Sequence, residues 1–104
     1  MQASLSATFT APLFRWEARV EEVFLVSLPQ DLSDHIRDLT AGGPPRGFGS
    51  VKVSVLVGTS RWRTSIFPGK DDAPYVLPIK RAVYVREGIE PGDPVTVHLD
   101  VLDG

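Results

Sequence analysis

The sequence contains no cysteine among its 104 residues. A disulfide framework, a thiolate nucleophile and a cysteine-based zinc site are therefore excluded. No apolar run approaches the roughly 20 residues that a membrane-spanning helix needs, and residues 1–7 lack the basic and apolar regions of a signal peptide. We therefore expect a cytoplasmic protein that makes no use of a membrane.

Net charge is also small, at −2, because 11 basic residues are interspersed with 13 acidic ones. Such a balance provides no overall field that would attract nucleic acid, so nucleic acid is not an expected partner. The hydrophobic fraction of 42% and the charged fraction of 23% are typical of a globular protein. We expect one domain over residues 1–104.

One pattern occurs twice: an apolar strand ending in Leu-Pro, a short helix, a Gly-rich turn and a second strand. The segments of the first copy are 24–29, 31–40, 46–50 and 51–57, and those of the second are 75–78, 79–87, 88–93 and 95–101. Two such half-units can close one small barrel within a single chain. The pattern predicts a mostly β protein, a closed β-barrel with two short helices built from duplicated half-barrels. A monomer is favoured, with a dimer as the alternative.

The first helix is predicted from Leu32, Ile36 and Leu39, which recur at helical spacing and form one apolar stripe. The second helix is predicted over residues 80–87, although two valines there disfavour helix.

A hairpin is predicted over residues 51–67, with a two-residue turn at Gly58-Thr59. This register sets Val55 opposite Trp62 and gathers the valines on one face. A shift by one residue would place arginines against the valines, so the pattern selects the first register.

Motifs along nearly the whole chain are similar to those of a known family. They are Phe9-Thr-Ala-Pro12, Trp16-Glu17, Leu28-Pro29, Ile36, Gly47-Phe-Gly-Ser50, Trp62-Arg-Thr64, Phe67-Pro68, Leu77-Pro-Ile-Lys80, Gly88-Ile89, Gly92-Asp93 and Val95. In order and spacing they resemble the bacterial family catalogued as domain of unknown function 1905. The resemblance implies a small double-split β-barrel, topologically similar to the swapped-hairpin barrels of transition-state regulators and antitoxins. In those relatives two chains build one barrel, whereas the repeat here suggests a single-chain equivalent.

The best candidate for a binding site is the segment Arg46-Gly-Phe-Gly-Ser50. Backbone N–H groups at Gly47 and Gly49, with Arg46 and Ser50 beside them, could cradle an anion. The alternative, which we favour, is that the two glycines only permit a tight turn into the following strand. Lys80 is a second candidate, because the fold analogy places both turns at related positions, and a solvated lysine is its alternative.

Other chemistry-bearing residues have simpler interpretations. Lys52, Arg61 and Arg63 share one strand face, which could lie on DNA or be an ordinary solvated surface, the interpretation that we favour. The aromatic residues that could line a pocket or belong to the core are Trp16, Trp62, Phe67 and Tyr75.

Neither of the two histidines, His35 and His98, has a second metal-ligating residue at a suitable spacing, so we predict no metal site. The sequence places neither of them beside a serine, so we predict no catalytic triad. No cofactor is expected, and no catalytic residue can be named.

The sequence therefore predicts a non-enzymatic binding domain for a small anionic ligand, with Arg46, Gly47, Gly49, Ser50 and Lys80 as its site. One alternative is a dimeric nucleic-acid-binding regulator that resembles the swapped-hairpin barrels. A third is an enzyme of unassigned chemistry.

Overall fold

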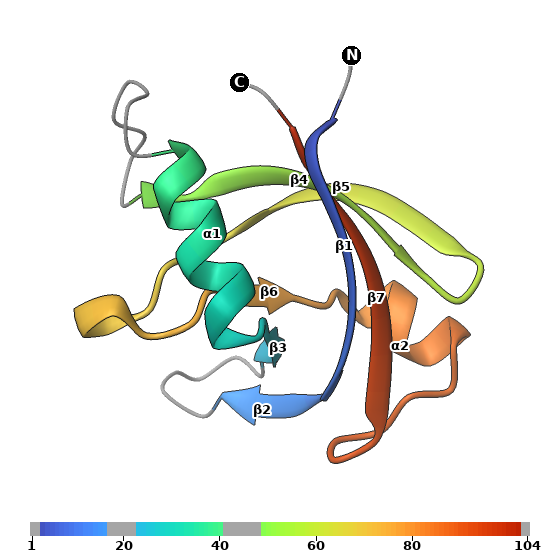
Figure 1. Ribbon diagram of the computed structural model, residues 1–104. Helices are drawn as coiled ribbons and strands as arrows, with labels where there is room; N and C mark the ends of the chain where they lie inside the picture. Colours follow the sequence, from blue (N-terminus) through green and yellow to red (C-terminus); the bar gives the residue numbers. More distant parts are fainter. Residues whose placement is uncertain (1–2, 17–22, 41–48, 103–104) are drawn as a thin grey trace.

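Two sheets and two helices make up the structure, a computed structural model that describes residues 3–16, 23–40 and 49–102 (Figure 1). In chain order the elements are β1 (Ala3–Pro12), β2 (Phe14–Trp16), β3 (Val23–Ser27), α1 (Gln30–Thr40), β4 (Val51–Val57), β5 (Ser60–Ile66), the 3₁₀ turn η2 (Lys70–Asp72), β6 (Val76–Pro78), α2 (Arg81–Arg86) and β7 (Pro94–Leu102). Strands dominate, which confirms the mostly β class with two short helices.

The predicted closed barrel is wrong. The strands form a four-stranded sheet in the order β1-β7-β4-β5 and a separate three-stranded sheet in the order β2-β3-β6. Closure would need continuous ladders where the sheets meet. At one junction, β5 and β6 are joined by an isolated bridge in which Phe67 and Val76 exchange both backbone hydrogen bonds. The next hydrogen-bonding positions on the β6 side would be Pro78 and Pro74, and neither proline has an N–H to extend the ladder.

The other junction lies between β1 and β2, the edge strands of the two sheets. Here the chain runs directly from β1 into β2, and the two strands do not pair with each other. Leu13 lies between the two strands, and its N–H donates to the carbonyl of Asp93 at 2.9 Å. β2 then pairs with β3 through three residues. The double-split barrel that the family resemblance implied is therefore not closed, because strands as short as β2 and β6 cannot supply the missing ladders.

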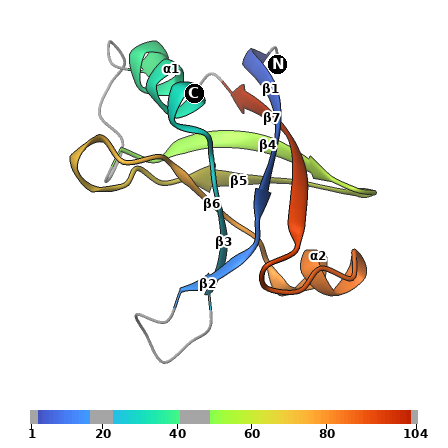
Figure 2. The same cartoon turned by 60° about the horizontal axis from the view of Figure 1, so that its bottom comes forward.

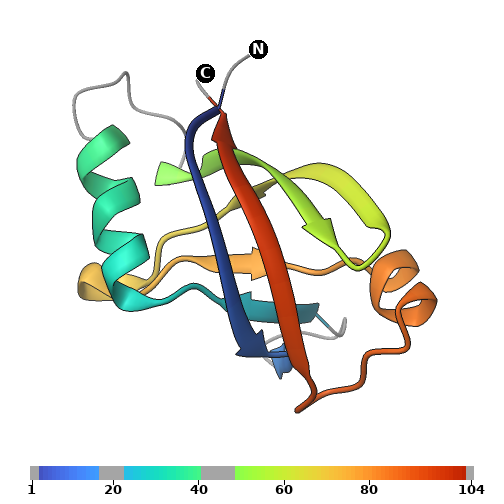
Figure 3. The same ribbon diagram turned by 45° about the vertical axis from the view of Figure 1, so that its right-hand side comes forward.

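The two copies of the sequence repeat pair with each other. Their first strands, β3 and β6, are antiparallel, and the repeat-equivalent residues Ser27 and Val76 lie directly opposite each other. Their second strands, β4 and β7, are also antiparallel, with the equivalent residues Val55 and Leu99 opposite each other. An approximate twofold relation therefore joins the two halves, and it places α1 and α2 at opposite ends of the molecule (Figures 1 and 3).

The predicted hairpin register is confirmed. Val55 lies opposite Trp62, and Val51 lies opposite Ile66. The turn contains Gly58 at φ +58°, a conformation that glycine adopts at low cost. The four valines of β4 are buried on one face, as the alternating pattern requires.

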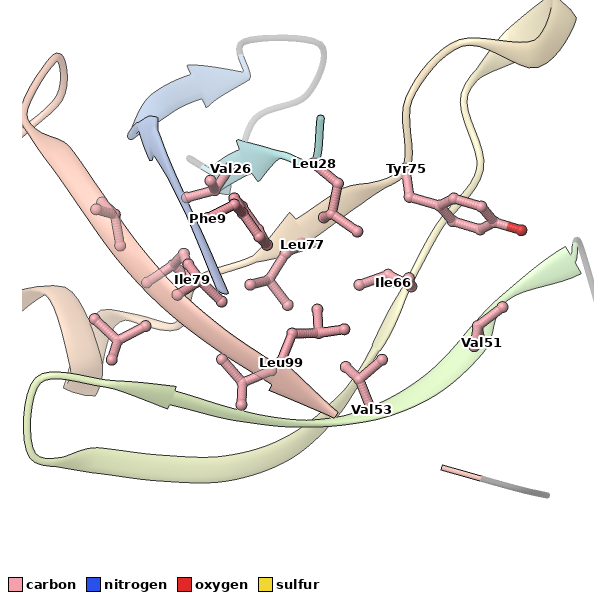
Figure 4. Close-up of a cluster of buried hydrophobic side chains, with 14 of the residues drawn as sticks. Phe9, Val26, Leu28, Val51, Val53, Ile66, Tyr75, Leu77, Ile79 and Leu99 are labelled. Carbon is pink, nitrogen blue, oxygen red and sulfur yellow. The ribbon is translucent and has the colours of Figure 1, made fainter. Parts of the chain in front are cut away.

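The core lies between the two sheets (Figure 4), where side chains from β3 and β6 meet those from β4, β5 and β7. Val26, Leu77, Val53 and Ile66 are each 0% exposed. β1 and β7 run side by side along one edge of this core (Figures 2 and 3). The strongly alternating burial of β7 places one face on the core and leaves the other to solvent.

Each helix seals one end of the core. α1 buries Ser33 and Ile36, whereas Leu39, predicted to belong to its apolar stripe, is 44% exposed. α2 buries Val83, and the ring of Tyr84 packs against that of Phe24 with 4.6 Å between centroids.

Candidate functional site

The Gly-rich segment is described only in part, because Arg46 and Gly47 lie outside the described residues. Gly49 has φ +74°, and a Cβ there would lie 3.3 Å from Cγ of Pro68. The positive φ suits glycine and turns the chain sharply before β4. Ser50 follows it and is half-buried. The backbone conformation at position 49 is therefore sufficient to explain why a glycine stands there.

Lys80 lies far from this segment in the fold. Ser50 precedes β4 at the α1 end of the molecule, whereas Lys80 precedes α2 at the opposite end (Figures 1 and 3). The approximate twofold relation explains the separation, since it carries each half's helix to the other end. The structure therefore does not bring Lys80 and Ser50 together.

A groove surrounds Lys80. It has a volume of about 330 Å³ and lies where β3, β5 and the connection from β6 to α2 meet. Its lining residues are Val23, Phe24, Trp62, Arg63, Thr64, Pro78, Ile79, Lys80, Arg81 and Tyr84. This volume is at the lower end of the range for small-molecule sites.

Backbone hydrogen bonds hold Lys80 at the groove. The N–H of Ile79 donates to the carbonyl of Phe24 at 2.9 Å, which ties the residue before Lys80 to β3. The Lys80 carbonyl then accepts from the N–H groups of Val83 at 2.9 Å and Tyr84 at 3.2 Å. Lys80 itself is extended, with φ −74° and ψ 155°, and so lies at the boundary where strand geometry gives way to helix.

Three cations line the groove: Arg63 from β5, Lys80, and Arg81 from α2. All three are exposed. Within the described ranges none of them forms an ion pair or a side-chain hydrogen bond, and no described lining residue is acidic. Three like charges around one small volume produce a positive potential that attracts an anion.

The remaining polar side chains of the groove form no side-chain hydrogen bonds with other described residues. Thr64, the hydroxyl residue on the valine face of the hairpin, is half-buried, as are Trp62 and Tyr84. In the part of the chain that the structure describes, their side chains have no hydrogen-bond partner, and no fully buried polar side-chain atom is left without a partner. These groups are therefore accessible at the groove surface.

Of the four aromatic residues predicted to line a pocket or the core, Trp62 lines this groove. Tyr75 is buried, and its ring lies 5.3 Å from the guanidinium carbon of Arg37. Trp16 on β2 and Phe67 after β5 are 52% and 41% exposed. Neither of these two contributes to the groove.

The other candidates are on solvated surfaces. Lys52 and Arg61 are exposed on the outer face of β4 and β5, as predicted. Arg63 has the same parity as Arg61 on β5, but β5 is the edge strand of its sheet and Arg63 also lines the groove. His35 is exposed on α1, and His98 on β7 lies 2.9 Å from the hydroxyl of Thr8 through its Nδ1 atom. Among the described residues, no three His, Asp or Glu side chains gather as metal ligands would.

No helix in the described ranges has both the length and the apolar character needed to cross a membrane.

Sequence reasoning found Lys80 and Trp62 but not their neighbours Arg81 and Tyr84. The three-residue spacing of this last pair on α2 puts both on one helix face, which was an available signal. Nothing in the sequence showed that this face lines the same groove as β5.

The family is decided by residues 9–99, which match a family described as a domain of unknown function, DUF1905. The chain belongs to the DUF1905 family. The match confirms the resemblance drawn from the sequence motifs. No curated protein matches the chain. All ten groove residues, from Val23 to Tyr84, lie inside the segment that matches DUF1905.

Proposed function

We propose that this DUF1905 domain binds a small anionic ligand, without converting it chemically, in the groove around Lys80. The observation that carries the proposal is the set of three cations around a groove of about 330 Å³, none of which has an ion-pair partner among the described residues. A negatively charged ligand would be attracted by all three cations. Each pair of opposite unit charges about 4 Å apart contributes roughly 1 kcal/mol of interaction energy even in bulk water.

Binding rather than catalysis is proposed because the groove offers no nucleophile beside a base. Thr64 is the lining residue with an aliphatic hydroxyl, and in the described ranges it has no histidine or carboxylate partner. An activated hydroxyl needs a general base within hydrogen-bond reach.

The test is isothermal titration with small anions at low ionic strength, comparing two matched variants. Lys80→Gln should weaken binding at least fivefold, whereas Lys52→Gln, the same change on the outer face of β4, should not. Both residues are exposed, so neither change should lower the melting temperature appreciably. Added salt should also weaken binding, because it screens exposed charges.

Two results would overturn the groove as the site. Absence of binding to any anion at low salt is the first. The second is a ligand that is lost in Arg46→Gln and kept in Lys80→Gln, which would place the site at the Gly-rich segment instead.

We further propose that the protein acts as a monomer. The support is that the two halves of one chain pair with each other, β3 with β6 and β4 with β7, so no partner chain is needed to complete them. Light scattering coupled to size-exclusion chromatography measures the mass directly. A stable dimer would instead favour the alternative of a twofold nucleic-acid-binding regulator. The cytoplasmic location stays a prediction from the sequence.

A further inference from the structure

The groove's polar side chains are almost entirely hydrogen-bond donors. Arg63, Lys80 and Arg81 donate only, the indole of Trp62 donates only, and the hydroxyl groups of Thr64 and Tyr84 can donate. A matching ligand group should therefore carry several acceptors and no donor. A carboxylate provides two oxygen atoms and one charge, whereas a phosphate monoester provides three terminal oxygens and nearly two charges at pH 7.

The rest of the groove is apolar and aromatic. Trp62 from β5 and Tyr84 from α2 are half-buried, so each ring is partly accessible, while Phe24 beneath Tyr84 is 8% exposed. Val23, on the adjoining strand β3, extends the apolar lining. Rings that remain accessible beside cations are the arrangement on which a planar ring stacks.

We propose that the ligand of this groove is a phosphate monoester of a planar ring, the chemical class that includes nucleoside monophosphates. The phosphate lies against Lys80, Arg63 and Arg81, and the ring lies against Trp62 and Tyr84. This inference rests on the proposed function, because it specifies the anion that the same groove takes.

Four probes separate the charge of the ligand from its ring. Phenyl phosphate carries both features, phenyl sulfate keeps the ring with a single negative charge, cyclohexyl phosphate keeps the dianion without a planar ring, and inorganic phosphate has no ring. Titration calorimetry at pH 7.5 and low salt should show phenyl phosphate binding roughly fivefold or more tightly than each of the other three.

Variants of Trp62 test the ring contact. Trp62→Leu should lower affinity for phenyl phosphate roughly tenfold, toward the lower end of the range for base–aromatic stacking, and leave that for inorganic phosphate unchanged. Trp62→Phe should restore most of the loss, because it retains a ring. Trp16→Leu removes the chain's other tryptophan outside the groove and should leave affinity for phenyl phosphate unchanged. Because Trp62 packs against the core, each variant is compared at a temperature at which circular dichroism shows it folded.

The outcomes distinguish this inference from the proposed function. Equal affinity for phenyl sulfate and phenyl phosphate, with loss in Lys80→Gln, would keep the anion site and overturn the phosphate monoester. Equal affinity for cyclohexyl and phenyl phosphate would overturn the planar ring. No binding to any of the four probes would overturn the inference, and the proposed function would fall only if every other anion also failed to bind.

Discussion

The hydroxyl of Ser60 donates a hydrogen bond to the carboxylate of Glu87, with 2.7 Å between Oγ and Oε2. Ser60 is the first residue of β5, and Glu87 follows the last residue of α2. Thr59 donates to the same oxygen at 3.2 Å. One carboxylate thereby ties the turn of the β4–β5 hairpin to the helix that carries Arg81 and Tyr84 of the groove.

The first prediction concerns pH. The hydrogen bond from Ser60 is the largest cause that lowers the pKa of Glu87 below its ordinary value of 4.5. A carboxyl group whose pKa is lowered in the folded state stabilises the fold above its unfolded pKa, and this contribution is lost as the pH falls through the folded pKa. The melting temperature of Glu87→Gln should therefore lie below that of the natural protein near neutral pH, and the gap should shrink below about pH 4.5.

Thermal unfolding followed by circular dichroism across this range measures the gap. Glu90→Gln is the matched control, because the Glu90 side chain is exposed and forms no hydrogen bond within the described residues. A gap for Glu87→Gln that stays constant down to about pH 3 would contradict the assignment.

The second prediction concerns the hairpin turn. Gly58 has φ +58°, and a Cβ there would overlap the Glu87 carboxylate. Gly88 has a similar φ of +67°, with nothing within 4 Å of an added Cβ. Gly88→Ala should cost about 1–2 kcal/mol from backbone strain alone, and Gly58→Ala should cost more because strain and overlap add.

Chemical denaturation of both variants measures these free energies of unfolding. Glu87→Ala in the Gly58→Ala background should cost less than it does in the natural protein, since there the loss of the Glu87 carboxylate also relieves its overlap with the new Cβ. Equal free energies for Gly58→Ala and Gly88→Ala would show that Glu87 does not restrict the turn.

The third prediction concerns a hydrogen bond between α1 and the start of β6. Ser33 is 0% exposed, and its Oγ accepts from the N–H of Tyr75 at 3.0 Å. Ser33→Ala leaves that buried N–H without a partner, so we expect a loss of about 1–3 kcal/mol. Ser54→Ala on β4, where the side chain has no partner among the described residues, should change stability by less than about 0.5 kcal/mol. Equal effects in urea denaturation would remove Ser33 as a link between the two elements.

The fourth prediction concerns the centre of the core. Leu99 is 1% exposed and pairs across the sheet with its repeat equivalent, Val55. Leu99→Ala should cost about 2–5 kcal/mol, the range for truncating a buried leucine. Leu39→Ala on α1, at a side chain 44% exposed, is the matched control and should cost far less. Similar midpoints of denaturation for the two variants would mean that the core is not packed as described.

Local pattern was enough to predict many of the elements. The hairpin register followed from alternation, because any one-residue shift would have buried arginine among the valines of β4. The two helices were expected directly after the Leu-Pro steps of the repeated pattern, and α1 and α2 do follow Leu28-Pro29 and Leu77-Pro78. Leu39 shows the limit of such reasoning, since helical spacing marks a side chain as able to be buried, and only the neighbouring elements decide whether anything covers it.

The candidate site could be predicted only in part. Lys80 and Trp62 were singled out from the sequence, but Ser50 and Lys80 were expected together and lie at opposite ends of the molecule (Figure 1). A sequence repeat predicts that corresponding segments take equivalent places in the two halves. Because an approximate twofold rotation relates the halves, those equivalent places lie at opposite ends of the molecule. Residues from β3, β5 and α2 line the groove, and no local pattern encodes that these three elements surround one volume.

The sequence by itself determined the mostly β class, the hairpin register, the two helices and the DUF1905 membership, because alternation, proline positions and motif spacing are local properties of the chain. Tertiary structure alone decided that the sheets stay open and that Arg63, Lys80 and Arg81 surround one groove. Both outcomes depend on how far the ladders between distant strands extend, and that extent is set by the packing of the whole core rather than by any single segment.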